Sequence, residues 1–160
     1  MVERVYDRAA AAAYARRWAM GRNPAYYDFS ALGGDCTSFA SQCLYAGAGV
    51  MDFTPVTGWY YRAASDRTAS WTGVEYLFAY LTRTGGGPGP YARIVTAAEA
   101  MPGDVVQLGA ADGDFYHTPV IVAVTPEILV CAHSFDALDR PLSSYVYSEA
   151  RFLHIMGVNL

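Results

Sequence analysis

The hydrophobic pattern of the chain changes near its middle, and this change limits the fold more than any other feature. In the first half, apolar residues recur at spacings of three and four, which is typical of amphipathic helices. Glycines follow the first two of these segments, and Thr72 and Glu75 have the spacing of a capping box at the third. The pattern predicts three helices, over residues 4–20, 35–46 and 73–83.

The second half carries short apolar runs that are bounded by turn residues. These runs predict four strands, over residues 104–109, 117–124, 128–134 and 151–158. Only Thr125-Pro126-Glu127 separates the second from the third, so these two strands are expected to form an antiparallel hairpin. We therefore expect an α+β fold in which N-terminal helices pack on a small antiparallel sheet.

The composition is that of a globular chain, with 53% hydrophobic and 16% charged residues. Its length fits one domain, so residues 1–160 are expected to fold as a single unit. A net charge of −4 without a basic stripe argues against a nucleic-acid partner. No apolar run approaches the roughly 20 residues that span a bilayer. Charged residues at positions 3–8 are not typical of a signal peptide, which leaves a cytoplasmic protein or a domain of a longer secreted or phage-associated chain.

Three cysteines, an odd number in a chain of this length, do not indicate a disulfide framework. Cys36 follows Gly33-Gly34-Asp35 at the start of a predicted helix, where free N–H groups favour a thiolate and can bind an oxyanion. Cys36 is therefore the predicted nucleophile, and Asp35 is expected to cap the helix through its carboxylate. Cys43 and Cys131 are expected to pack in the core.

A cysteine nucleophile needs a base, and the base needs a group that orients it. His117 begins one strand of the predicted hairpin and His133 lies near the end of the other, so the two are expected to be cross-strand partners. His117 is then the predicted base and His133 its orienting residue, with Asp136 or Ser134 as alternatives. His154 lies in an apolar strand and is expected to be structural.

The ordered motifs of this chain resemble the putative amidase domain family, within the NlpC/P60-like, papain-like cysteine hydrolases. The resemblance covers about residues 5–156 and is carried by Gly33 to Phe39, Ser41 to Leu44, Pro102 to Gln107, His117, and Ala132-His133-Ser134. It implies a Cys–His–polar triad of Cys36, His117 and His133 that hydrolyses amide or peptide bonds, often in cell-wall peptidoglycan, without a cofactor. It further implies that a tyrosine upstream of the cysteine, here Tyr27, supports the oxyanion.

Other hypotheses compete with a hydrolase that acts on a peptide or amide substrate. The same fold could have lost its chemistry and act as a peptide-binding module, or it could transfer an acyl group to an amine. Four residues, Cys36, His117, Cys131 and His133, are acceptable zinc ligands, although their spacing does not match a short zinc motif. Trp59 and Trp71 suit either a substrate groove or the core.

Overall fold

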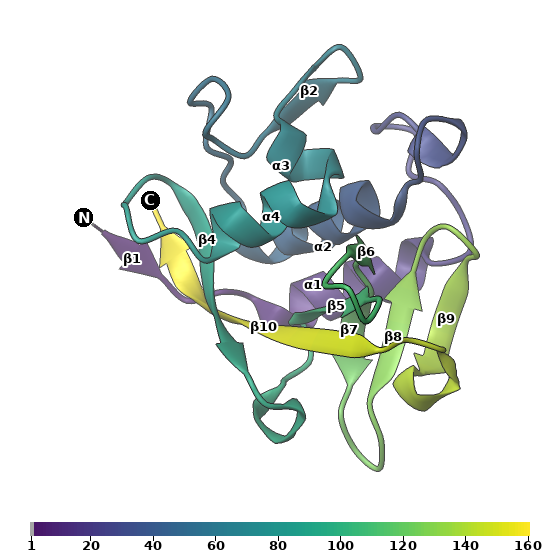
Figure 1. Ribbon diagram of the computed structural model, residues 1–160. Helices are drawn as coiled ribbons and strands as arrows, with labels where there is room; N and C mark the ends of the chain where they lie inside the picture. Colours follow the sequence, from purple (N-terminus) through teal and green to yellow (C-terminus); the bar gives the residue numbers. More distant parts are fainter. Residues whose placement is uncertain (1) are drawn as a thin grey trace.

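The computed structural model describes residues 2–160, and within this range the chain places helices over one face of a curled antiparallel sheet (Figure 1). The α-helices are α1 (Arg8–Trp18), α2 (Cys36–Ala48), α3 (Ala69–Thr72) and α4 (Val74–Leu81). Short 3-10 helices occur at η1 (Phe29–Ala31), η2 (Ala97–Glu99) and η3 (Leu142–Ser144).

An eight-stranded sheet runs in the order β1-β10-β5-β7-β8-β9, with β4 also pairing with β10 and β6 with β5. The long strand β10 pairs with β1, β4 and β5 along its length, so it joins three strands that are far apart in the sequence. A separate small hairpin joins β2 and β3. The strands are β1 (Glu3–Arg4), β2 (Tyr61–Ala63), β3 (Asp66–Arg67), β4 (Gly89–Val95), β5 (Val105–Gly109), β6 (Phe115–His117), β7 (Val120–Ala123), β8 (Leu129–Ala132), β9 (Ala137–Pro141) and β10 (Glu149–Asn159).

The α+β class is confirmed, but the prediction of a small sheet was wrong. Neither strand of the small hairpin, β2 or β3, was predicted. Within the eight-stranded sheet, the strands without a prediction are β1, β4 and β9, which carry several exposed or half-buried side chains. Their sequences include glycine, proline and charged residues, and so lack the apolar pattern on which strand prediction depends. Backbone hydrogen bonds to neighbouring strands make them part of the sheet, and this pairing leaves no mark in the local sequence.

The predicted helices differ from the observed ones by a few residues at their ends. Helix α1 begins at Arg8, because the Asp7 side chain accepts a hydrogen bond of 3.0 Å from the Ala10 N–H and so caps the helix. Helix α2 matches its prediction and ends at Gly49, whose φ of +73° is typical of a helix C-terminus. The prediction that Thr72 begins a capping box for the third helix was wrong, since Gly73 is the residue before α4 and Thr72 belongs to α3.

Strands β5, β8 and β10 confirm three of the predicted strands, and the predicted hairpin is the antiparallel pair β7–β8. The predicted strand over 117–124 contains β7 and only the last residue of β6, and the two are separated because Pro119 has no N–H to donate to a strand ladder. Val120 pairs with Cys131, a register that continues to place Thr118 opposite His133. His117 instead pairs with Leu108 of β5, so the predicted cross-strand pairing of the two histidines was wrong.

Two hydrophobic clusters fill the interior, one on each face of the sheet. The larger cluster lies between the sheet and the helices and includes Trp59 and Trp71, both fully buried, so these residues belong to the core and not to a groove. Cys43 and Cys131 are also fully buried there, as predicted. The smaller cluster lies on the opposite face of the sheet and includes Val106 of β5, so the middle of the sheet is buried on both sides.

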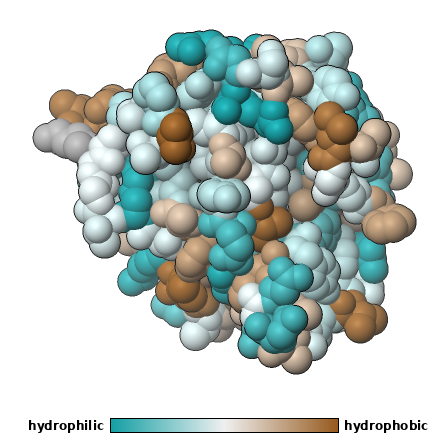
Figure 2. Space-filling model, turned by 45° about the horizontal axis from the view of Figure 1, so that its top comes forward, coloured by the Kyte–Doolittle hydropathy of each residue, from teal (hydrophilic) through white to brown (hydrophobic). Residues whose placement is uncertain are grey.

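The surface in Figure 2 shows hydrophobic residues scattered singly or in small groups among polar ones, without a broad apolar patch on that face. Among residues 2–160, no helix has both the length and the apolar character that crossing a bilayer requires.

Candidate active site

Cys36 and His117 line one pocket of about 500 Å³. Cys36 is the first residue of α2, and His117 is the last residue of β6. The sequence therefore identified two residues, 81 positions apart, that the fold brings to the same cavity. The other residues that line it are Ser30, Gly33, Gly34, Tyr116, Ser134, Phe135, Arg140 and Tyr145.

A hydrogen bond between two threonines fixes this arrangement. Thr37 follows Cys36 and Thr118 follows His117, and the two buried hydroxyl oxygens lie 3.1 Å apart. Gln107 donates to the same Thr118 hydroxyl at 3.3 Å, which ties the pair to β5. The structure records no hydrogen bond between the Cys36 sulfur and the His117 ring within residues 2–160. Such contacts often become short only when substrate is bound.

The turn before Cys36 depends on its glycine pair. Gly33 and Gly34 have φ values of +90° and +110°, in a region that other residues rarely adopt. The Gly34 N–H donates to the Phe29 carbonyl, and the Asp35 N–H donates to the Ser134 hydroxyl at 3.0 Å. These bonds direct the chain into α2 with Cys36 at its start.

The Cys36 thiol and the His117 imidazole are both held in their neutral forms. Burial raises the pKa of the Cys36 thiol, and hydrogen bonds from Thr37 and from the Thr118 backbone only partly offset this effect. Burial and the nearby Arg140 guanidinium lower the pKa of His117 from 6.5 to about 4. At neutral pH the resting pair is therefore a thiol and an uncharged imidazole, whereas the sequence had predicted that the helix start would favour a thiolate.

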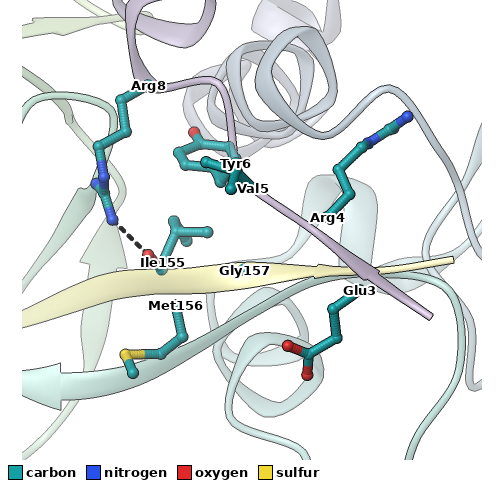
Figure 3. A pocket seen from close by; sticks show the side chains of 8 residues that line it. All are labelled: Glu3, Arg4, Val5, Tyr6, Arg8, Ile155, Met156 and Gly157. Atoms are coloured by element: carbon teal, nitrogen blue, oxygen red, sulfur yellow. Dashed lines mark hydrogen bonds between the residues drawn. The ribbon is translucent and has the colours of Figure 1, made fainter. Parts of the chain in front are cut away.

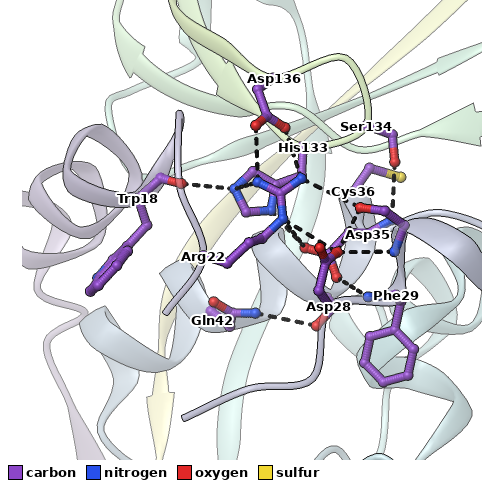
Figure 4. Close-up of polar contacts among 12 residues, drawn as sticks. Trp18, Arg22, Asp28, Phe29, Asp35, Cys36, Gln42, His133, Ser134 and Asp136 are labelled. Carbon is purple, nitrogen blue, oxygen red and sulfur yellow. Dashed lines mark hydrogen bonds and ion pairs between the residues drawn. The ribbon is translucent and has the colours of Figure 1, made fainter. Parts of the chain in front are cut away.

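His133 lies behind the pocket, and both nitrogens of its ring have partners (Figure 4). Its Nδ1 is 2.6 Å from Asp35 Oδ2, and its Nε2 is 2.8 Å from the Trp18 carbonyl oxygen. The ring also stacks on Phe39, with the centroids 4.0 Å apart. His133 is thus joined to the residue before the nucleophile, and no hydrogen bond connects it to His117 in the described part of the chain.

Asp35 precedes α2, but its carboxylate does not cap the helix, so that prediction was wrong. Asp35 Oδ1 accepts the Phe29 N–H at 2.9 Å, and Oδ2 accepts from His133. The carboxylate is therefore used to hold the loop before the helix against the strand that carries His133.

Arg22 extends this polar network toward the surface. Its guanidinium donates two hydrogen bonds of 3.0 Å to Asp136 and lies 3.3 Å from Asp28 (Figure 4). The hydrogen bond with Asp136 raises the pKa of Arg22 further above its usual range. Asp136, the alternative orienting residue, is thus paired with Arg22, and the structure does not bring it to His117.

Tyr27 does not line the pocket. Its side chain is exposed and packs edge-on against Phe29, while its N–H donates to the Tyr61 hydroxyl at 2.8 Å.

The sequence did not single out Phe135, Arg140 or Tyr145, which do line the pocket. Phe135 has a φ of +60°, and nothing in its local sequence predicts this conformation.

His154 has a structural place, as predicted, because its Nδ1 lies 2.8 Å from the buried Asp104 carboxylate. No group of three or more histidine, cysteine or acidic side chains within residues 2–160 is arranged to hold a metal ion. A second hollow lies at the other end of the molecule, between β1, the start of α1 and β10, and includes Arg8, which donates to the Ile155 carbonyl (Figure 3). Neither a cysteine nor a histidine lines this second hollow.

Comparison with known proteins identifies the family of this chain. A family described as "Putative amidase domain" matches residues 5–156. The chain belongs to this family. A protein of Bacillus subtilis (strain 168) named "Uncharacterized protein YhbB" is 40% identical over 121 residues, which are 74% of this chain and 37% of that protein. No solved structure matches. The description of the family indicates hydrolysis of amide bonds.

Proposed function

We propose that this amidase domain hydrolyses amide or peptide bonds by a cysteine-dependent mechanism of the NlpC/P60-like kind, with peptidoglycan peptides as the first substrates to test. The observation that carries the proposal is the placement of Cys36 and His117 in one pocket by the hydrogen bond between Thr37 and Thr118. A thiol at a helix start and a neutral imidazole are the two groups that acyl transfer from an amide requires.

In the first half of the reaction, His117 takes the proton of the Cys36 thiol as the sulfur attacks the amide carbonyl carbon. N–H groups at the start of α2 donate to the oxyanion that forms. His117 then gives its proton to the leaving nitrogen, the C–N bond breaks, and the acyl group stays on Cys36 as a thioester. His117 is unprotonated throughout the neutral pH range, so its ring nitrogen is available for this proton.

In the second half, water enters and His117 takes one of its protons as the oxygen attacks the thioester. The C–S bond breaks, the acid leaves, and the proton returns to the Cys36 sulfur. Both halves use the same base and the same oxyanion donors, so no further group is needed for proton transfer.

Asp35 and His133 act in this proposal as positioning residues. Asp35 Oδ2 and His133 Nδ1 lie 2.6 Å apart. This contact joins the loop before Cys36 to the residue that directly follows β8. Substitution of His133 by glutamine is expected to lower kcat by weakening this support, while the alkylation of Cys36 is retained. Tyr27 is assigned a lesser role, as support for the neighbouring Phe29 ring next to this loop.

The test is release of new amino termini from muropeptides and acylated peptides, followed by mass spectrometry. Wild-type protein is expected to cleave at least one class of these substrates. Cys36→Ala is expected to abolish cleavage, and His117→Ala to lower kcat on the order of 10²- to 10⁴-fold, because general base catalysis is worth about that much.

Cys43→Ala is the matched control, since Cys43 lies in the core and away from the pocket. Its activity should remain close to that of the wild type once the two proteins are compared well below their melting temperatures. Cleavage that survives in a folded Cys36→Ala variant would exclude the cysteine mechanism.

A further inference from the structure

Arg140 is the one permanently charged side chain among the residues that line the Cys36 pocket. It lies on β9, and its guanidinium carbon is 3.7 Å from the centre of the Tyr145 ring. Its Nε donates to the Ser144 hydroxyl at 2.8 Å, and its Nη2 donates to the Ser144 carbonyl at 3.1 Å. Stacking and two hydrogen bonds therefore hold the guanidinium in one place.

No carboxylate neutralises this guanidinium within residues 2–160. Arg16, Arg22 and Arg151 each form an ion pair with an aspartate or a glutamate, and Arg140 forms none. Its hydrogen bonds engage Nε and Nη2 only, so Nη1 lacks a protein acceptor in the described chain. A fixed, half-buried arginine with a free nitrogen is a ready binding group for an anion, and its planar fork matches a carboxylate.

The walls around Arg140 suit an organic ligand. Phe135 is 93% exposed, and its φ of +60° is a strained conformation for an aromatic residue. The Tyr145 hydroxyl is buried and has no hydrogen-bond partner among residues 2–160. None of the residues that line the pocket is acidic, so an anion would meet no repulsion there.

We propose that Arg140 binds a carboxylate of the substrate, so that the hydrolysed amide belongs to an acidic peptide. This inference rests on the proposed function, because Cys36 and His117 of the same pocket supply the reaction. Arg140 is then the residue that selects acidic substrates, and Phe135 packs on the chain that carries the carboxylate.

The test compares two alkylating reagents that differ in one charge. Both reagents alkylate the sulfur at their CH₂ carbon and release iodide; iodoacetate transfers a carboxymethyl group, which carries a carboxylate, and iodoacetamide transfers a neutral carbamoylmethyl group. Their rates at Cys36 are measured by peptide mapping in wild type, Arg140→Gln, Arg140→Lys and Arg93→Gln. Cys43 and Cys131 are fully buried, so native protein should react first at Cys36.

Arg140→Gln is expected to lower the ratio of the iodoacetate rate to the iodoacetamide rate about five- to tenfold, which is the size of one charge interaction across a partly solvated pocket. Arg140→Lys should retain most of the ratio, and Arg93→Gln, which removes an exposed charge outside the pocket, should not change it. In wild type, high salt should lower the ratio of the iodoacetate rate to the iodoacetamide rate, because salt screens the charge of Arg140.

The ratio cancels any change in thiolate fraction, and the iodoacetamide rate of each variant shows that its pocket is folded. An unchanged ratio in Arg140→Gln would overturn the carboxylate site. Failure of the proposed function would have a different signature, namely cleavage of muropeptides or acylated peptides that survives in a folded Cys36→Ala variant.

Discussion

At the scale of single residues, the site depends on two neutral groups that the surrounding protein keeps neutral. His117 is half-buried, and its ring is tilted against the Tyr145 ring with the centroids 5.7 Å apart. It lies close enough to Arg140 to be affected by its charge. Burial is the larger cause of its lowered pKa, and the guanidinium adds to it. One arginine would thus do two things, since it binds the substrate and keeps the base unprotonated.

A titration of the histidine Cε1 protons by NMR should show His117 with a pKa of about 4, against an ordinary value of 6.5. Arg140→Gln should raise this pKa without restoring the ordinary value, because burial remains. His117→Gln assigns the signal. Activity should then fall only as the pH falls through about 4. A wild-type His117 that titrates at 6.5 or above would contradict the neutral-pair mechanism.

The same shift affects stability with a definite sign. The folded-state pKa of His117 is below its unfolded value, so the unfolded chain takes up a proton that the folded chain does not. The contribution of His117 to the free energy of unfolding is therefore complete above pH 6.5 and is lost as the pH falls from 6.5 to about 4.

At the scale of elements, α2 carries the nucleophile and its far end is fixed by close contact with the start of α1. A methyl group on Gly47 would lie 2.8 Å from the Asp7 carbonyl oxygen and would overlap the Tyr6 ring. The Asp7 N–H donates to the Gly47 carbonyl at 3.0 Å, and Tyr6 donates to Gly103 at 2.8 Å. This glycine therefore sets how closely the first two helical segments approach.

Gly47→Ala is expected to lower the free energy of unfolding by about 1–2 kcal/mol, because overpacking outweighs the better helix propensity of alanine. Urea denaturation followed by circular dichroism measures this change. Gly85→Ala is the control, since Gly85 is exposed with nothing within 4 Å of the added methyl group, and it should change stability by less than about 0.5 kcal/mol. An equal or greater stability of Gly47→Ala would exclude this close contact.

At the scale of the whole molecule, one buried carboxylate joins α1 to the sheet. Asp104 is fully buried and accepts from Arg8 at 2.7 Å and from His154 at 2.8 Å. It also accepts the N–H groups of Met101 and Ile155, each at 2.9 Å. Segments near the two ends of the chain, at Arg8 and at His154-Ile155, therefore meet at Asp104. Asp104 belongs to the Pro102 to Gln107 motif.

Asp104→Asn is expected to lower the free energy of unfolding by about 2–4 kcal/mol, because Arg8 would lose its charged partner in a buried place. Asp66→Asn is the matched control at the exposed pair with Arg62, where the cost should stay below about 1 kcal/mol. Chemical denaturation of both variants measures the difference. Equal costs would show that the buried network does not stabilise the fold.

Most of what lies close together in the chain could be predicted from the sequence. The helix that begins at Cys36, the strands at β5, β8 and β10, and the β7–β8 hairpin follow from local pattern and turn residues. The strands β1, β4 and β9 could not be predicted, because they form by pairing with distant segments and not by their own preference.

The sequence by itself determined that Cys36 would lie at a helix start after a glycine turn and that His117 would lie at the edge of a strand. Only the tertiary structure decided their surroundings. One residue of register separates His117 from the position opposite His133, and alternate residues of a strand point to opposite faces. For that reason His133 contacts Asp35 and Trp18 in the interior, while Arg140 and Phe135, from a strand and a loop without a sequence signal, complete the pocket.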